Sequence, residues 1–131
     1  MEAVVHDDGQ LSIVLWTTDV AGLASFLRDV AGLTLEQQHP GYAVLSAGAT
    51  CLMLHADEAY RGHPWYDALS REGAARGIGA ELRFRVHDVE AAYHAALHRG
   101  AAAIAGPYDS GNGFECSVMG PDGYLISLWH E

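Results

Sequence analysis

Hydrophobic and polar positions follow the same order in two stretches of the chain. Residues 12–32 read SIVLWTTDVAGLASFLRDVAG, and residues 81–100 read ELRFRVHDVEAAYHAALHRG. Each begins with the alternation typical of a strand with one buried face, and continues through an Asp into apolar positions at helical spacing. Asp19 and Asp88 are expected to cap the two helices, and a Gly ends each of them. Two copies of one strand–helix unit imply two similar halves.

The remaining pattern adds three strands to each half. In the first half we expect a strand over 11–18, a helix after Asp19, and strands over 33–38, 42–46 and 50–55. In the second half we expect a strand over 79–86, a helix over 89–99, and strands over 102–105, 114–119 and 124–129. Gly106-Pro107 is expected to open a loop, and residues 120–123 place Pro and Gly where a β-turn favours them.

These elements predict an α+β fold in a single domain, residues 1–131, with eight strands and two main helices. The first βαββ module covers residues 11–56, the second covers residues 78–130, and the partly helical residues 57–77 are expected to link them. One helix can cover only one face of a four-stranded sheet. We therefore expect the opposite faces to line a cleft formed by strands of both modules.

Composition narrows the class of protein. Half of the residues are hydrophobic and 18% are charged, as in a folded globular domain. No apolar run approaches the roughly 20 residues that span a membrane, and the first ten residues do not resemble a signal peptide, so we expect a cytoplasmic protein. A net charge of −10 argues against a nucleic-acid partner. Cys51 and Cys116 form no CxxC pair and are expected to be buried thiols.

Three stretches carry a resemblance to a known superfamily. They are TTDVAGLASFLRDVAGL, ELRFRVHDVEAAYHAALHRGA and MGPDGYLISLW. Together with the element order, they resemble the vicinal oxygen chelate superfamily of glyoxalase I, extradiol dioxygenases, fosfomycin resistance enzymes and bleomycin resistance proteins, over about residues 11–129. The resemblance implies paired βαββ modules, and it implies a homodimer because many members build their site from two chains.

The resemblance also implies where a metal would bind. Metal-using members place His and Glu ligands on the first, fourth, fifth and eighth strands, and the corresponding positions here hold Ser12, Met53 or nearby His55, Glu81, and Ser127. Hydroxyl and thioether groups are poor ligands for such cations. We therefore expect no bound metal and no other cofactor. The alternative is a divalent metal ion held by Glu81 and His55.

Alternation along the strands predicts which side chains line the cleft. In the fifth strand the apolar positions pack under the second helix, so Glu81, Arg83 and Arg85 face the other way. Extending this to the other strands predicts the ligand-binding residues Trp16, Met53, His55, Glu81, Arg83, Ser127 and Trp129, with Trp65 of the linker as a further candidate. Alternatively, the arginines pair with surface acids and the tryptophans fill the core or a dimer contact. Glu81 is the best candidate for a catalytic residue.

Two other patterns resemble sites. His94 and His98 are one helical turn apart, but the residues between them are Ala-Ala-Leu, without the Glu of a zinc-protease motif. They share a helix face with Glu90, and we expect that face to be solvated. Residues 111–113, Gly-Asn-Gly, lack the Lys and the following helix of a phosphate-binding loop.

Two functions fit these observations. The first is a metal-free homodimer that binds or sequesters a small, partly aromatic compound, as bleomycin resistance proteins do. An acidic surface would also attract cationic compounds. The alternative is a metal-dependent lyase, isomerase or dioxygenase with an atypical ligand set.

Overall fold

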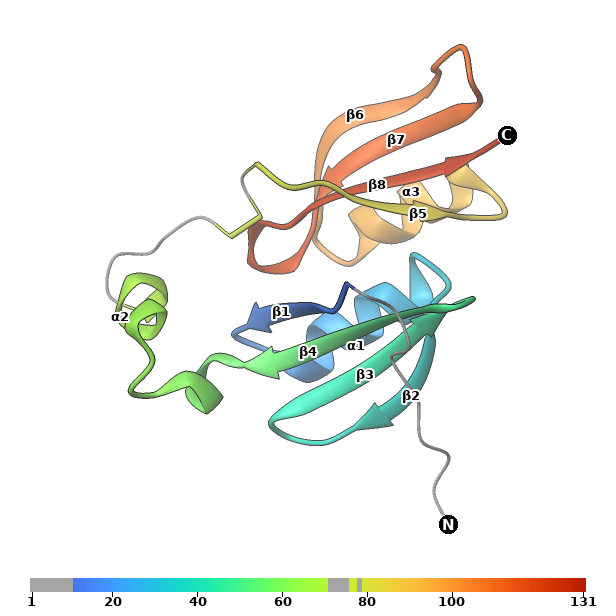
Figure 1. Cartoon of the computed structure of the whole chain (residues 1–131). Helices are drawn as coiled ribbons and strands as arrows, with labels where there is room; N and C mark the ends of the chain where they lie inside the picture. The colour runs from blue at the N-terminus through green and yellow to red at the C-terminus, as the bar shows by residue number, and fades with distance from the viewer. Residues whose placement is uncertain (1–10, 71–75, 78) are drawn as a thin grey trace. The chain divides into compact units, whose positions relative to one another are not determined.

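The computed structural model of the protein describes residues 11–70, 76–77 and 79–131. These residues divide into two compact units, the first with residues 11–28 and 32–70 and the second with residues 29–31, 76–77 and 79–131. Each unit contains a four-stranded sheet (Figure 1). Part of the predicted linker, residues 71–75, lies outside the described residues.

The first unit follows the predicted order of strand, helix and three strands. Its elements are β1 (Ile13–Thr17), α1 (Val20–Asp29), β2 (Thr34–Gln38), β3 (Tyr42–Ala47) and β4 (Thr50–Ala56). The strand order is β1-β4-β3-β2, with β1 parallel to β4 and the other neighbours antiparallel. The 3-10 helix η1 (Asp57–Tyr60) and the short helix α2 (Pro64–Ser70) follow in the stretch that was predicted to be partly helical.

The second unit repeats this arrangement. Its elements are β5 (Leu82–Arg85), α3 (Val89–His98), β6 (Ala102–Asp109), β7 (Phe114–Met119), η2 (Pro121–Gly123) and β8 (Leu125–His130). The strand order is β5-β8-β7-β6, and β5 is parallel to β8. The turn predicted at residues 120–123 is present, with the Gly123 N–H donating to the Gly120 carbonyl at 3.1 Å. The α+β fold and its internal repeat are therefore confirmed.

Both long helices begin and end as predicted. The Gly22 N–H donates to Asp19 Oδ1 at 2.9 Å, and the Ala91 N–H donates to Asp88 Oδ1 at 3.1 Å. Each carboxylate satisfies a backbone donor that has no partner within its helix. Past the helix ends, Gly32 and Gly100 have φ values of 77° and 88°, a left-handed conformation that favours glycine.

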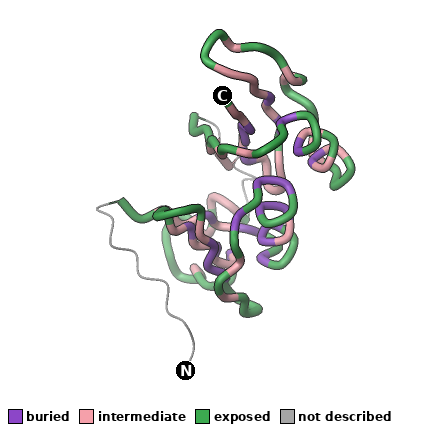
Figure 2. Tube along the Cα trace, turned by 90° about the vertical axis from the view of Figure 1, so that its right-hand side faces the viewer, coloured by how far each residue is buried: buried purple, intermediate pink, exposed green. Residues whose placement is uncertain are grey.

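Each sheet buries one face beneath its helix. In the second unit α3 packs across β6, β7 and β8, over the fully buried Val118, Ile126 and Leu128. In the first unit α1 lies against the sheet, and Leu45 and Leu54 are fully buried (Figures 1 and 2). Buried and half-buried positions alternate along β4 and β7, and half-buried and exposed positions alternate along β5, as a strand with one covered face requires.

Two strands differ from the prediction by more than two residues at one end. The loop expected from Gly106-Pro107 is wrong, because β6 continues to Asp109 with register shifts on either side of Ala105. β6 is an edge strand, where Pro removes no N–H that the sheet needs. β5 is shorter than predicted, and its pairing with β8 starts at Leu82, so Glu81 directly precedes the strand.

The cysteines and the histidine pair of α3 occupy different environments. Both cysteines are thiols, and Cys116 is buried, which raises the pKa of its thiol to about 11. The prediction that Cys51 is buried is wrong: it is half-buried, because it alternates with the buried Leu52 and Leu54 and lies on the face opposite to theirs. His94 and His98 are exposed, as predicted for a solvated helix face.

The described part of the chain contains no helix that is both long and apolar enough to cross a membrane.

Candidate functional site

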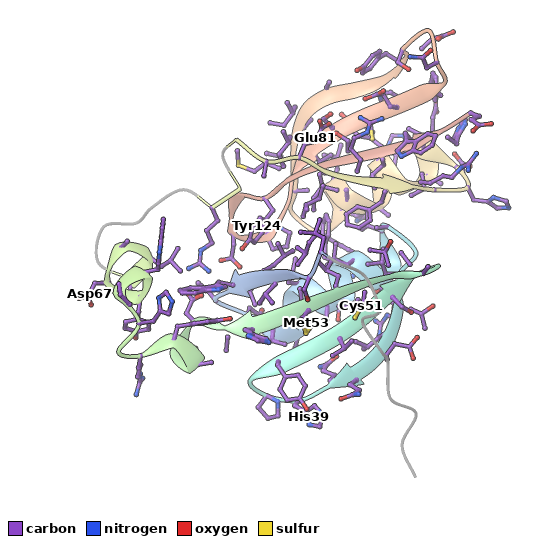
Figure 3. All side chains as sticks on the ribbon, in the orientation of Figure 1. His39, Cys51, Met53, Asp67, Glu81 and Tyr124 are labelled. Atoms are coloured by element: carbon purple, nitrogen blue, oxygen red, sulfur yellow. The ribbon has the colours of Figure 1, made fainter. Side chains whose placement is uncertain are left out.

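The uncovered face of the first sheet carries a row of ring side chains. Strand register places Trp16 of β1 beside His55 of β4, and His55 beside Tyr42 of β3. The rings of Tyr42 and His55 meet edge to face at 6.5 Å, and His39 stacks on Tyr42 at 4.5 Å. The adjacent row is apolar, with Met53 between Val14 and Val44. Figure 3 labels Met53 and Cys51 on β4 and His39 beside the β2–β3 turn.

Tyr60, which was not predicted as a site residue, completes this row. It ends η1, and its ring stacks on Trp16 with centroids 3.5 Å apart and an interplanar angle of 14°. Its hydroxyl is hydrogen bonded to His55 Nδ1 at 2.6 Å. Partial burial raises the pKa of Tyr60, so the phenol keeps its proton at neutral pH. The first unit therefore holds a Trp–Tyr–His cluster joined by ring stacking and a hydrogen bond.

Trp65 lies on α2, outside this stack. Its side chain is 67% exposed, and its backbone N–H donates to His63 Nδ1 at 3.1 Å. His63 itself meets Trp16 edge to face at 5.3 Å. In this segment His63, rather than the predicted Trp65, therefore contacts the stacked ring of Trp16.

The uncovered face of the second sheet carries a polar network. Ser127 of β8 is fully buried, and its hydroxyl donates to Glu81 Oε2. The Ser117 and Ser127 hydroxyls are hydrogen bonded at 3.1 Å. Arg83 Nη1 lies 3.4 Å from Glu81 Oε2 and 3.3 Å from Glu115 Oε2. The predicted residues Glu81, Arg83 and Ser127 are therefore brought together, and Figure 3 labels Glu81 in this unit.

Two guanidinium groups lie against the indole of Trp129. The Arg83 and Arg85 Cζ atoms are 5.9 Å and 5.1 Å from the ring centroid, within the range of cation–π contacts. Arg85 also pairs with Glu131 at 2.7 Å. Hydrogen bonding to Glu115 is the main cause that raises the pKa of Arg83, and its guanidinium stays charged. Trp129 is thus the aromatic centre of a cluster of paired charges.

A cavity of about 250 Å³ opens beside this cluster. Its wall comes from β5, β7, β8 and the β6–β7 turn, and consists of Arg83, Ser110, Asn112, Gly113, Phe114, Glu115, Trp129 and His130. Sequence reasoning identified Arg83 and Trp129 but missed Glu115. Alternation along β7 could have found Glu115, because it lies two residues before Ser117 on the same face and pairs with Trp129.

The residues present do not fit the metal site that the resemblance implied. Within residues 11–70, 76–77 and 79–131, no three His, Cys, Asp or Glu side chains gather in a group that could hold a metal ion. Glu81 is hydrogen bonded to Ser127, and His55 is hydrogen bonded to Tyr60. Protein sites for zinc generally use three or four ligands of these types.

The fold resembles that of solved structures. A glyoxalase/bleomycin resistance protein/dioxygenase family enzyme from Burkholderia phytofirmans PsJN has a TM-score of 0.71 and 22% identity, over 90% of this chain and 94% of that chain. A glyoxalase-related enzyme from Fulvimarina pelagi has a TM-score of 0.72 and 15% identity, over 93% and 88% of the two chains. At these identities the likeness shows the fold alone. No curated protein matches the chain at a significant level.

The family assignment comes from the sequence itself. The sequence profile of the Glyoxalase/Bleomycin resistance protein/Dioxygenase superfamily matches residues 9–128, which include both long helices and all strands except the last two residues of β8. The match spans the two copies of the repeat that the hydrophobic pattern predicts. This chain belongs to the Glyoxalase/Bleomycin resistance protein/Dioxygenase superfamily.

Proposed function

We propose that the chain binds a small, partly aromatic compound without a bound metal ion, in the manner of a bleomycin resistance protein. The cavity of the second unit is the observation that carries this proposal. Trp129 and Phe114 give it aromatic walls, and polar or charged side chains form most of the remainder, namely Arg83, Ser110, Asn112, Glu115 and His130. Small-molecule sites combine aromatic surface with polar groups that fix the orientation of the ligand, and about 250 Å³ suits one ring with a polar substituent.

The donor groups at the family's metal positions support binding rather than metal chemistry. Ser12, Met53 and Ser127 offer hydroxyl and thioether groups, and Glu81 is already engaged by Ser127 and Arg83. The alternative is a metal-dependent lyase, isomerase or dioxygenase. It requires Glu81 and His55 to bind the metal ion together with other ligands of unusual residue types. Metal analysis of protein purified without chelators separates the two functions, because stoichiometric metal would contradict the binding-protein proposal.

Ligand screening by thermal shift tests the proposal directly, since a compound that binds only the folded state raises the melting temperature. We expect aromatic compounds to raise it. Trp129→Ala should lower the affinity for the best compound about tenfold or more, as loss of a central aromatic contact does. Ile104→Ala is the control, because Ile104 is an exposed apolar residue on β6 outside the cavity wall. Equal binding by the Trp129 variant would mean that the ligand binds elsewhere.

Homodimer formation is part of the proposal. Tyr42 is 40% exposed in the single chain, and Trp16, Phe114 and Trp129 are only half-buried. Burying such aromatic area between subunits stabilises a pair by roughly 25 cal/mol per Å². Sedimentation equilibrium at micromolar concentration is expected to give twice the chain mass of 14.0 kDa. A mass near 14.0 kDa would exclude the dimer.

A further inference from the structure

We propose that the cavity beside Trp129 takes a planar organic cation, such as an aromatic amidine or guanidine, and that Arg83 occupies the cation's place until the ligand displaces it. This inference rests on the proposed function, because it assigns a charge class to the ligand of the same cavity.

Arg83 already makes the contacts that such a ligand would make. Its guanidinium, a planar delocalised cation, lies 5.9 Å from the centroid of Trp129 and within 3.4 Å of carboxylate oxygens of Glu81 and Glu115. The cavity wall includes both Arg83 and Trp129. A planar cation can therefore meet an aromatic face and a carboxylate in this place at the same time.

The ion pairs of Arg83 are weak enough to be exchanged. Its distances of 3.4 Å and 3.3 Å to the two carboxylates exceed the roughly 2.7–2.9 Å of a strong charge-assisted hydrogen bond. The Arg83 side chain is 45% exposed, so it can swing into water without burying its charge. Exposed pairs of this kind contribute little to stability. Displacing Arg83 therefore costs the fold little.

Carboxylates outnumber guanidinium groups in the ion pairs beside the cavity. Among the residues that the structure describes, these pairs join the carboxylates of Glu81, Glu115 and Glu131 to the guanidinium groups of Arg83 and Arg85. Glu115 is the most enclosed of the three acids, at 14% exposure, and a buried charge is screened least by water. The pKa of Tyr108 is raised, first by desolvation and then by the charge of Glu115. Once Arg83 leaves, a ligand cation can take its place beside Glu115.

An anionic ligand fits the same surroundings poorly. Arg83 and Arg85 both have carboxylate partners, and an anion would have to displace Glu115 or Glu131 from them. Glu115 belongs to the cavity wall and would repel the anion directly. The chain as a whole, at −10, also favours the approach of cations.

Isothermal titration calorimetry with three probes of the same shape tests this inference. Benzamidine is charged at neutral pH, benzamide is neutral, and benzoate is an anion. We expect benzamidine to bind about tenfold or more tightly than the other two, with an affinity that falls as salt is added. Benzamide or benzoate binding as tightly as benzamidine would overturn the cation assignment.

Two variants with a matched control locate the site. Glu115→Gln should weaken benzamidine binding about tenfold, because the charged partner is lost. Arg83→Met should strengthen it several-fold, because the competing cation is gone while the apolar stem remains. Glu90→Gln removes the same charge from an exposed position on α3 and should change nothing. Unchanged or weaker binding by Arg83→Met would contradict the displacement of Arg83.

The outcomes separate this inference from the proposed function. If neutral aromatic compounds bind at Trp129 and benzamidine does not, the cation assignment is overturned and the binding function stands. If no compound raises the melting temperature of the wild-type chain, the binding function itself is contradicted. Should Glu115→Gln fail to fold, the probe series and the Arg83 variant still decide the question.

Discussion

Replacing Leu128 by Ala is expected to lower the free energy of unfolding of the second unit by about 3 kcal/mol. Leu128 is 0% exposed on β8, an inner strand, and its neighbours in register are Phe84 on β5 and Cys116 on β7. Truncation removes buried methyl groups and leaves a cavity beneath α3, which these elements can close only partly. Chemical denaturation followed by circular dichroism measures the change.

Ile104→Ala is the matched control for this core substitution. Ile104 lies on the edge strand β6 and is 55% exposed, so its truncation should change stability by no more than about 0.5 kcal/mol. If the two units unfold in separate steps, Leu128→Ala should shift only the step of the second unit. A cost below about 1 kcal/mol would show that α3 does not enclose Leu128 tightly.

Local signals predicted the architecture well because they act over a few residues. Asp19 and Asp88 each cap the helix that directly follows, and a cap needs only the first turn to form. Alternation along β5 correctly separated the exposed Arg83 and Arg85 from the half-buried Leu82 and Phe84, since side chains of a strand point to opposite faces in turn. The strand order then repeats because the two halves share this local pattern.

Contacts between distant residues were not available from the sequence. Tyr60 stacks on Trp16 only because η1 returns to the sheet after β4, and no periodicity marks that return. Arg83 pairs with Glu115, 32 residues away, through two long side chains whose rotamers the strand pattern does not fix. The sequence predicted that β6 ends before Pro107, because proline disrupts an inner strand. Pro107 is tolerated because β6 is an edge strand, and that position depends on the order of the whole sheet. Site residues that such contacts bring together can be identified only in the folded structure.

Gly113→Ala is expected to cost about 2–3 kcal/mol of stability and to weaken ligand binding in the cavity. Gly113 has a φ of 155°, which L side chains rarely adopt. A Cβ built there would also collide with the carbonyl oxygen of His130, and this backbone group can yield only if the end of β8 moves. Both residues belong to the cavity wall, so the shift should carry Trp129 and Phe114 out of position.

Two further glycines separate backbone strain from this collision. Gly111 has a φ of 90° with no atom within 4 Å of a built Cβ, so Gly111→Ala should cost only about 1 kcal/mol of strain. Gly41 has neither a positive φ nor a close neighbour, and Gly41→Ala should be close to neutral. The difference between the Gly113 and Gly111 variants measures the contact with His130. If both substitutions lower the free energy of unfolding equally, the end of β8 can shift at little cost. The cavity should then keep its affinity for benzamidine.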